Sequence, residues 1–221
     1  MLPLCLAALS LILTWALIMP LRFSRMQGDT DTPFTFLLKA IPTAAAAAFA
    51  CCAALMPAAA PCARWMAAGL LVCLTADVVL GIRFEVGGGL FLLGHICYII
   101  GLMSLQTPSP ANGVILLIAL AVLEGLLYTC RGRMPNRLLA CGVYVYAAAL
   151  AALLAAALPL PFTVGGRGAT LAAVGAILFV LSDATLCDNM LNNRPRPNQY
   201  VSLGIYYTAQ LFLGMSALAV L

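Results

Sequence analysis

Charged residues are scarce in this sequence. Only 8% of the 221 residues are charged, 64% are hydrophobic, and the mean hydropathy is +1.08. A soluble globular domain has about a quarter of its residues charged, so the composition argues against a soluble domain and predicts an all-α membrane protein. Most of the 11 basic residues lie in short joints between apolar segments and form no continuous stripe, which argues against nucleic acid as a partner.

Histidine is almost absent, and so are the motifs of several enzyme classes. The one histidine, His95, excludes a three-histidine zinc site, and no HExxH motif occurs. The nine cysteines lie mostly within apolar runs and show no CxxC or Cys/His spacing, so we predict neither a metal site nor a disulfide. No GxSxG, P-loop or GxGxxG sequence is present, which argues against serine hydrolases and nucleotide-binding enzymes. We expect no cofactor.

Long apolar runs, by contrast, are abundant. A membrane-spanning helix needs about 20 apolar residues, and eight segments meet this length: 2–20, 36–56, 63–82, 88–106, 111–130, 137–159, 168–188 and 199–220. The first has no basic residue ahead of its apolar core, unlike a secretory signal, so we interpret it as a retained span. The second carries Lys39 and Pro42 in its predicted first turns. We therefore predict a single polytopic domain over residues 1–221.

The basic residues are placed asymmetrically between these spans. The joints after spans two, four and six contain only Arg64 and Arg167. The joints after spans one, three, five and seven contain Arg22, Arg25, Arg83, Arg131, Arg133, Arg137, Arg194 and Arg196. Cytoplasmic loops carry the excess of positive charge, so the second set is predicted to be cytoplasmic and both termini are predicted to lie on the outer face.

Two aspartates, Asp77 and Asp183, lie inside otherwise apolar spans. Each is predicted about five residues from the cytoplasmic end of its span, which is about 8 Å inside at 1.5 Å per residue. The segments TADVVLG and LSDATLC around them are weakly similar. This similarity predicts a parallel 4+4 internal repeat, with halves of roughly residues 1–110 and 111–221.

The matched aspartates favour a functional interpretation. An ionisable group within a membrane is by default a candidate site, and paired carboxyl groups suit general acid/base chemistry, in which one donates a proton and the other accepts one. The alternative is that each carboxyl group stabilises helix packing by bonding to a neighbouring hydroxyl or to Lys39. Two aspartates at one depth favour the catalytic pair.

Other polar residues enter the spans from the same predicted face. His95 and Tyr98 are one turn apart and can face one neighbour; for His95 a catalytic role and an interhelical hydrogen bond remain alternatives. Tyr207 and Gln210 are also one turn apart, and either substrate binding or packing suits them. Lys39 can pair with an aspartate or a lipid phosphate, or extend to the interface. We expect Tyr98, Lys39, Tyr207 and Gln210 to contribute to substrate binding.

Five motifs in order carry a resemblance to a known family. Lys39 with Pro42-Thr43, then TADVVLG, FLLGHICY, LSDATL and YYTAQLFLG together resemble the YhhN family, the lysoplasmalogenase family of eight-span membrane proteins. The resemblance implies that functional positions lie at Asp77, His95 and Asp183, supported by Lys39, Tyr207 and Gln210. The sequence departs from the family at Thr75-Ala76-Asp77, where a serine more usually precedes the aspartate.

The resemblance implies hydrolysis of the vinyl-ether bond of lysoplasmalogens to a fatty aldehyde and a glycerophospho-alcohol. It also implies a lysophospholipid substrate, surrounding membrane lipids as partners, and a location in a bacterial inner (plasma) membrane. The reaction needs a proton donor and a nearby carboxylate, which agrees with the paired aspartates. The sequence does not assign which aspartate is the acid, and it leaves homo-oligomerisation open.

A proton-coupled small-solute transporter is the competing interpretation, because such carriers also use intramembrane carboxylates. Alternating access requires polar residues toward both faces, whereas the outer halves of the predicted spans have almost none. This distribution favours the enzyme. A structural or assembly protein is a third interpretation, for which the matched aspartates need another explanation.

Overall fold

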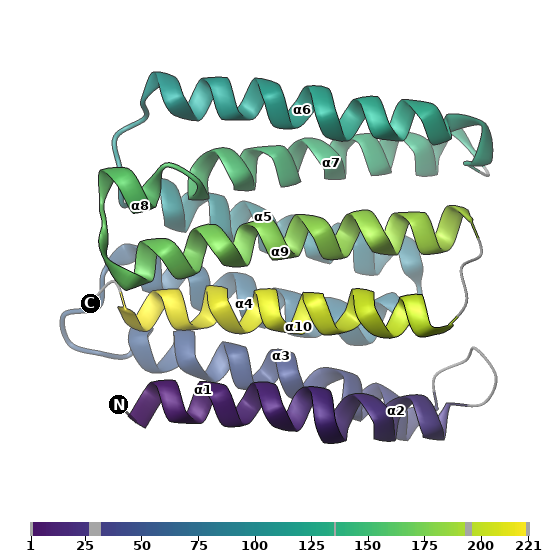
Figure 1. Cartoon of the computed structure of the whole chain (residues 1–221), viewed down its shortest axis with the longest axis horizontal. Helices are drawn as coiled ribbons and strands as arrows, with labels where there is room; N and C mark the ends of the chain where they lie inside the picture. Colours follow the sequence, from purple (N-terminus) through teal and green to yellow (C-terminus); the bar gives the residue numbers. More distant parts are fainter. Residues whose placement is uncertain (1, 27–31, 135, 193–195, 220–221) are drawn as a thin grey trace.

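Figure 1 shows long helices lying side by side in the computed structural model, which describes residues 2–26, 32–134, 136–192 and 196–219. The elements in order are α1 (Leu2–Leu13), η1 (Thr14–Ile18), α2 (Met19–Arg25), α3 (Pro33–Ala54), α4 (Pro61–Leu80), α5 (Phe84–Met103), α6 (Pro110–Cys130), η2 (Arg131–Arg133), α7 (Arg137–Ala157), α8 (Leu160–Thr163), α9 (Gly166–Leu191) and α10 (Arg196–Ala219). Eight helical stretches in these ranges are long and apolar enough to cross a membrane. The predicted number of spans is confirmed.

Several helices begin at a proline preceded by a capping side chain. Pro33 and Pro110 open α3 and α6, where the N–H group that proline lacks would have no helical partner. Thr32 accepts a hydrogen bond from the Thr35 N–H group (3.3 Å), while the Thr32 N–H group donates to Thr35 Oγ1 (2.6 Å). These reciprocal bonds satisfy backbone donors that a helix start leaves open. They explain why α3 begins three residues before the predicted span.

Pro42 lies in the interior of α3, not in its first turns as predicted. The sequence-based boundary was wrong because Pro33 and its cap extend the helix by a turn ahead of the apolar run. A proline inside a helix leaves one backbone carbonyl without its helical donor. In membrane helices neighbouring helices and local adjustments compensate for this loss. Pro42 and the next residue, Thr43, are both buried against other helices.

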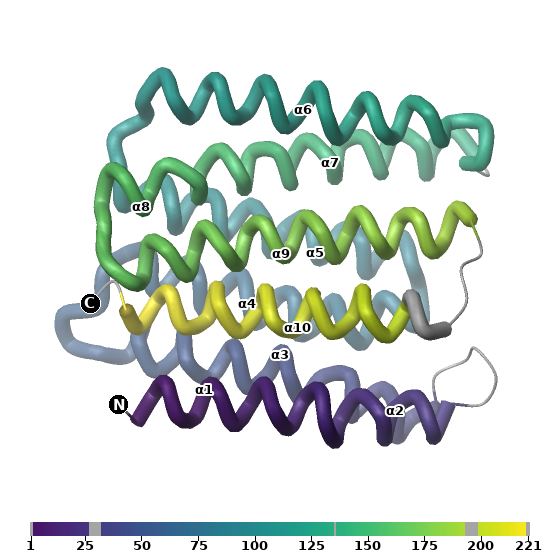
Figure 2. The backbone as a smooth tube through the Cα atoms, viewed as in Figure 1, coloured from purple at the N-terminus to yellow at the C-terminus, as the bar shows by residue number. Residues whose placement is uncertain are grey.

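The central helix of the bundle is α10. It packs mainly against α9 and α3 and also against α4, whereas α6 packs chiefly against α7 at the rim. In the apolar window of each span, 67% of the α10 residues are buried and only 6% of the α6 residues. Side chains on α10 therefore face protein on most sides. Figure 2 shows that the short α8 turns the chain from α7 into α9 at the end of the bundle where α1 begins.

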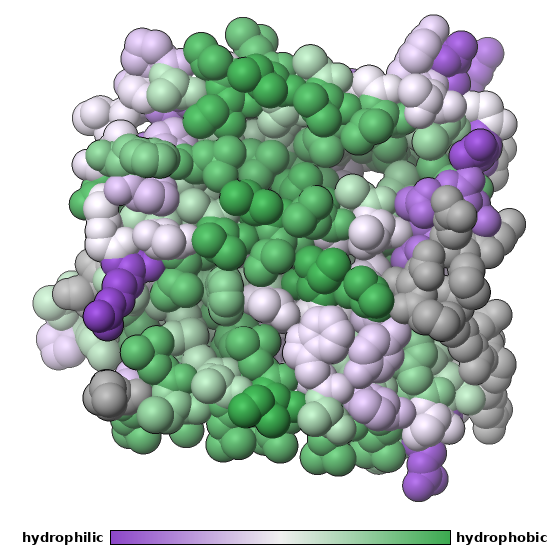
Figure 3. All heavy atoms as spheres, in the orientation of Figure 1, coloured by the Kyte–Doolittle hydropathy of each residue, from purple (hydrophilic) through white to green (hydrophobic). Residues whose placement is uncertain are grey.

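The surface separates into an apolar middle and more polar ends. Figure 3 shows hydrophobic residues across most of the visible face and hydrophilic residues toward both ends of the helices. The described arginines Arg22, Arg25, Arg83, Arg131, Arg133 and Arg137 lie in or beside the segments at one end, and Arg64 and Arg167 at the other. Arg194 is outside the described residues, as is the side chain of Arg196. The arrangement is that of an integral multi-pass membrane protein.

The two aspartates are not equally far from the ends of their helices. α4 ends at Leu80, three residues after Asp77, whereas α9 continues to Leu191, eight residues after Asp183. The equal offset of about five residues predicted from the apolar runs is therefore wrong. Hydropathy marks where a segment stops being apolar, but a helix ends where its backbone hydrogen bonds stop, and α9 continues through the polar residues after its apolar run.

Candidate functional site

Asp77 is held at the contact of three helices. Its side chain is 1% exposed, and its Oδ2 atom accepts hydrogen bonds from Thr43 Oγ1 of α3 (2.5 Å) and Tyr206 OH of α10 (3.0 Å). A buried carboxyl group requires such partners to offset the loss of hydration. The aspartate of α4 thus joins α3 to α10 at one oxygen atom.

A chain of hydrogen bonds continues from Tyr206 across α10 to α5. Gln210 Nε2 donates to Tyr206 OH (2.9 Å), and Tyr98 OH donates to Gln210 Oε1 (2.8 Å). Gln210 and Tyr98 are completely buried. Because Tyr206 donates its own proton to Asp77, its oxygen can accept the hydrogen bond from the Gln210 amide. The predicted residues Tyr98 and Gln210 therefore orient the hydroxyl that bonds to Asp77.

Asp183 has a different and less enclosed setting. It is partly exposed, and its Oδ2 atom accepts a hydrogen bond from Tyr146 OH of α7 (2.7 Å). Ser182 Oγ lies 3.4 Å from the other carboxyl oxygen, Oδ1. The aspartate of α9 is therefore held by one neighbouring helix and by a residue of its own helix.

His95 is completely buried in a group of aromatic rings. Its ring centroid lies 4.6 Å from that of Phe179, 5.2 Å from that of Tyr146 and 6.2 Å from that of Tyr98, all edge to face. Its Nδ1 atom lies 2.6 Å from the Phe91 carbonyl oxygen, one turn earlier on α5. A carbonyl oxygen can only accept, so Nδ1 carries the proton.

An aromatic cluster connects the surroundings of the two aspartates. We define it as Phe91, His95, Tyr98, Tyr146, Phe179, Tyr206 and Tyr207, whose rings contact one another. Phe179 lies 5.5 Å from Tyr206, which bonds to Asp77, and 4.6 Å from His95, which contacts Tyr146. The Cys73 thiol is also within electrostatic range of both carboxyl groups. The structure thus brings the predicted residues of five helices to one region.

Lys39 and Tyr207 lie on the Asp77 side of this region. Lys39 is 6% exposed, and its backbone carbonyl accepts a hydrogen bond from Tyr207 OH (3.0 Å). The charges of Lys39 and of Arg22, on α2, both interact with Asp77. Lys39 is therefore buried within the bundle and does not extend along its outer surface.

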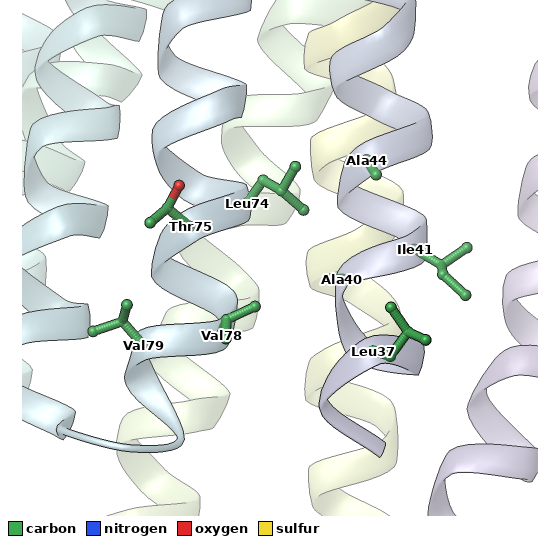
Figure 4. Close-up of a pocket in the computed structure, with 8 residues that line it drawn as sticks. All are labelled: Leu37, Ala40, Ile41, Ala44, Leu74, Thr75, Val78 and Val79. Carbon is green, nitrogen blue, oxygen red and sulfur yellow. The ribbon is translucent and has the colours of Figure 1, made fainter. Parts of the chain in front are cut away.

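An apolar groove lies between α3 and α4, the helices that carry Thr43 and Asp77. Figure 4 shows its lining residues, Leu37, Ala40, Ile41 and Ala44 of α3 and Leu74, Thr75, Val78 and Val79 of α4. Its volume is about 470 Å³. The one hydroxyl in the lining, that of Thr75, donates to the Leu71 carbonyl (3.1 Å). This groove suits a hydrocarbon chain.

Comparison with known proteins identifies the family. The model of the YhhN family matches residues 34–217. The chain belongs to the YhhN family. The resemblance inferred from the five sequence motifs is thereby confirmed. No curated protein and no solved structure matches the chain in these comparisons. The YhhN family is associated with lysoplasmalogenase activity, so membership suggests a lysoplasmalogenase-like membrane protein.

A residue outside the family match, Arg22, also contributes to the surroundings of Asp77. Arg22 lies on α2, before residue 34, and it was interpreted from the sequence only as a topology determinant. Tyr146 was missed altogether, because a tyrosine in an apolar span has no neighbouring motif to mark it. Within the described ranges, no group of three or more His, Cys, Asp or Glu side chains is arranged to hold a metal ion.

Proposed function

We propose that this YhhN protein is a membrane-embedded hydrolase that cleaves the vinyl-ether bond of lysoplasmalogen-type lysolipids. The products are a fatty aldehyde and a glycerophospho-alcohol. The observation that carries the proposal is the pair of intramembrane carboxyl groups, Asp77 and Asp183, each bonded to a tyrosine hydroxyl of one shared aromatic cluster. Packing alone does not call for two carboxyl groups beside the same set of rings, since charged groups in membranes are costly to retain.

Two carboxyl groups can carry out the whole reaction. The acid protonates the alkene carbon farther from the ether oxygen, and the neighbouring carbon becomes an oxocarbenium ion. Water adds to that ion while the carboxylate takes a proton from the water, as in paired-carboxylate glycosidases. The hemiacetal then breaks down: the carboxyl group that took the water proton donates it to the leaving glycerol oxygen, and the other carboxylate takes the proton of the hemiacetal hydroxyl as the aldehyde carbonyl forms. One water is consumed, and both carboxyl groups return to their starting states.

The charges near the two aspartates favour one assignment of roles. Asp77 interacts with Lys39 and Arg22 and accepts two hydrogen bonds at one oxygen, which suits the carboxylate that stabilises the cation and accepts the proton of water. Asp183, held by the Tyr146 hydroxyl, is then the proton donor. His95 lies between their tyrosine partners as part of the same site.

The groove and the basic residues support an orientation for the lipid. The hydrocarbon chain lies in the apolar groove between α3 and α4, the two helices that the Thr43–Asp77 hydrogen bond joins. The phosphate of the headgroup lies toward Lys39 and Arg22. We place the arginine-rich end of the bundle in the cytoplasm and both termini on the outer face, following the charge asymmetry.

Corresponding contacts in the two halves support a parallel 4+4 repeat within one polytopic domain. In each half the aspartate of the third span bonds to a hydroxyl of the second, Thr43 with Asp77 and Tyr146 with Asp183. The last helix of each half also packs against the second helix of the other, α5 against α7 and α10 against α3. A two-fold relation along the membrane normal accounts for both patterns.

Aldehyde release from a lysoplasmalogen by the purified protein in detergent, without added metal, tests the proposal. We expect release by the wild type and a loss of about 10²–10⁴-fold in Asp77→Asn and Asp183→Asn, with the larger loss in Asp183→Asn. Asp188→Asn is the matched control, because Asp188 is on α9 and bonds to Asn192 near the helix end; it should keep wild-type turnover. Wild-type rates of aldehyde release in both aspartate variants would contradict the mechanism. No aldehyde from folded wild type, with proton flux in liposomes, would establish the transporter instead.

A further inference from the structure

His95 has one ring nitrogen without a hydrogen-bond partner. Nε2 is fully buried, and no described group lies within hydrogen-bonding reach of it. Buried polar atoms of folded proteins are nearly always paired, and each exception calls for an explanation such as an unseen ligand or a catalytic role. The histidine contacts Tyr146, the partner of Asp183, and Phe179, which in turn contacts Tyr206, the partner of Asp77.

The Phe91 carbonyl determines what Nε2 can bind. Because Nδ1 donates its proton to that carbonyl, the neutral ring presents a lone pair at Nε2 and acts there as an acceptor. Nδ1 faces the backbone of its own helix, and the ring contacts Tyr146 of α7 and Phe179 of α9. A partner for Nε2 must therefore bring a proton.

The protein groups around His95 do not supply that proton. The Tyr146 hydroxyl donates to Asp183 and the Tyr98 hydroxyl to Gln210, and Phe179 has no polar atom. The Tyr206 hydroxyl, one ring farther away, donates to Asp77. Each of these donors already has an acceptor. The open position at Nε2 thus matches a hydroxyl group that arrives with the substrate.

We propose that His95 Nε2 accepts a hydrogen bond from the free hydroxyl on carbon 2 of the substrate glycerol, and so selects lysolipids. This inference rests on the proposed function. That hydroxyl is on the carbon next to the one that bears the ether oxygen, so its acceptor must lie in the same region as both carboxyl groups. His95 meets this condition through its contacts with Tyr146 and Phe179. A lipid acylated at carbon 2 has no proton to offer there. His95 then binds substrate and does not transfer protons.

Two substrates and two variants test the inference. The substrates are a lysoplasmalogen and its 2-deoxy analogue, which has hydrogen in place of the hydroxyl. A site that bonds to a substrate hydroxyl rejects the analogue without it strongly, so the wild type should prefer the hydroxyl substrate by about 10²-fold or more in kcat/KM. His95→Phe keeps an aromatic ring and removes the acceptor, so the preference in kcat/KM for the hydroxyl substrate over the 2-deoxy analogue should fall to near one. His95→Gln, whose amide oxygen can accept, should restore part of the preference.

The outcomes separate the inference from the proposed function. If His95→Phe slows both substrates equally, His95 acts on water or on packing and the inference is wrong. If the wild type releases aldehyde equally from both substrates, the inference again fails while the proposed function stands. If folded wild type releases aldehyde from neither, both fail. If His95→Phe does not fold, comparing the substrate preference of the wild type with that of His95→Gln still tests the inference.

Discussion

Asp77 and Asp183 both lie inside membrane-spanning helices, α4 and α9, but their surroundings differ. Asp77 is buried and bonded to hydroxyls from α3 and α10, with Lys39 and Arg22 close enough to interact. Asp183 is partly exposed and bonded to one hydroxyl from a neighbouring helix. Two aspartates inside apolar helices therefore have clearly different local surroundings. In the proposed mechanism, the cations and the second hydroxyl beside Asp77 give the two carboxyl groups different roles.

The largest expected difference between the two aspartates is in stability. Asp77→Ala removes the acceptor of two buried hydroxyls and a counter-charge of Lys39, so it should lower the free energy of unfolding by about 3 kcal/mol. Asp183→Ala should cost only about 1 kcal/mol, because that side chain is partly exposed and loses one interhelical bond. Equilibrium unfolding in mixed detergent micelles measures both, with Asp188→Ala as the control. Equal losses at Asp77 and Asp183 would show that their surroundings do not differ energetically.

The tyrosines that bond to the aspartates should show a smaller, kinetic effect. Tyr206→Phe and Tyr146→Phe each remove one hydrogen bond to a carboxyl group and keep the ring in the aromatic cluster. A lost hydrogen bond of about 1.4 kcal/mol corresponds to about tenfold in rate, so kcat should fall about tenfold in each. Tyr144→Phe, on the same helix as Tyr146, is the control. An unchanged kcat in Tyr206→Phe would contradict a role for the hydrogen-bond chain in positioning Asp77.

The smallest expected effect concerns the apolar groove between α3 and α4, the helix that carries Asp77. Ala44→Leu narrows the groove and should raise KM several-fold for long-chain lysoplasmalogens and less for short-chain ones, at about 0.8 kcal/mol per methylene displaced. A series of chain lengths measures this preference. Ala121→Leu, on the exposed side of α6, should leave the series unchanged. If both variants give the same chain-length profile, the hydrocarbon chain does not use the groove.

Much of the fold followed from composition and spacing. The long apolar runs predicted eight spans, because a segment of that length without charge is stable in a membrane only as a helix. Helix ends were less predictable, as Pro42 and the continuation of α9 to Leu191 show. Caps and backbone hydrogen bonds determine the ends of helices, and hydropathy does not report them.

Several residues of the candidate site were named from the sequence, but the contacts between them were not. Asp77, Asp183 and His95 were identified because polar side chains are costly in apolar spans. Tyr146 and Arg22 were not, because a tyrosine is common in membrane helices and an arginine at a span end has a sufficient explanation in topology.

The sequence by itself determined the class of protein, the number of spans and the ionisable residues within them, since hydrophobicity and charge are properties of each residue. Only the tertiary structure decided which hydroxyl bonds to which aspartate, where the cations lie, and that His95 keeps an open acceptor. Those facts depend on how helices distant in sequence pack. Thr43 and Asp77 meet across 34 residues, and Tyr206 reaches Asp77 across 129. The spacing of residues within one helix does not predict contacts between helices that are distant in sequence.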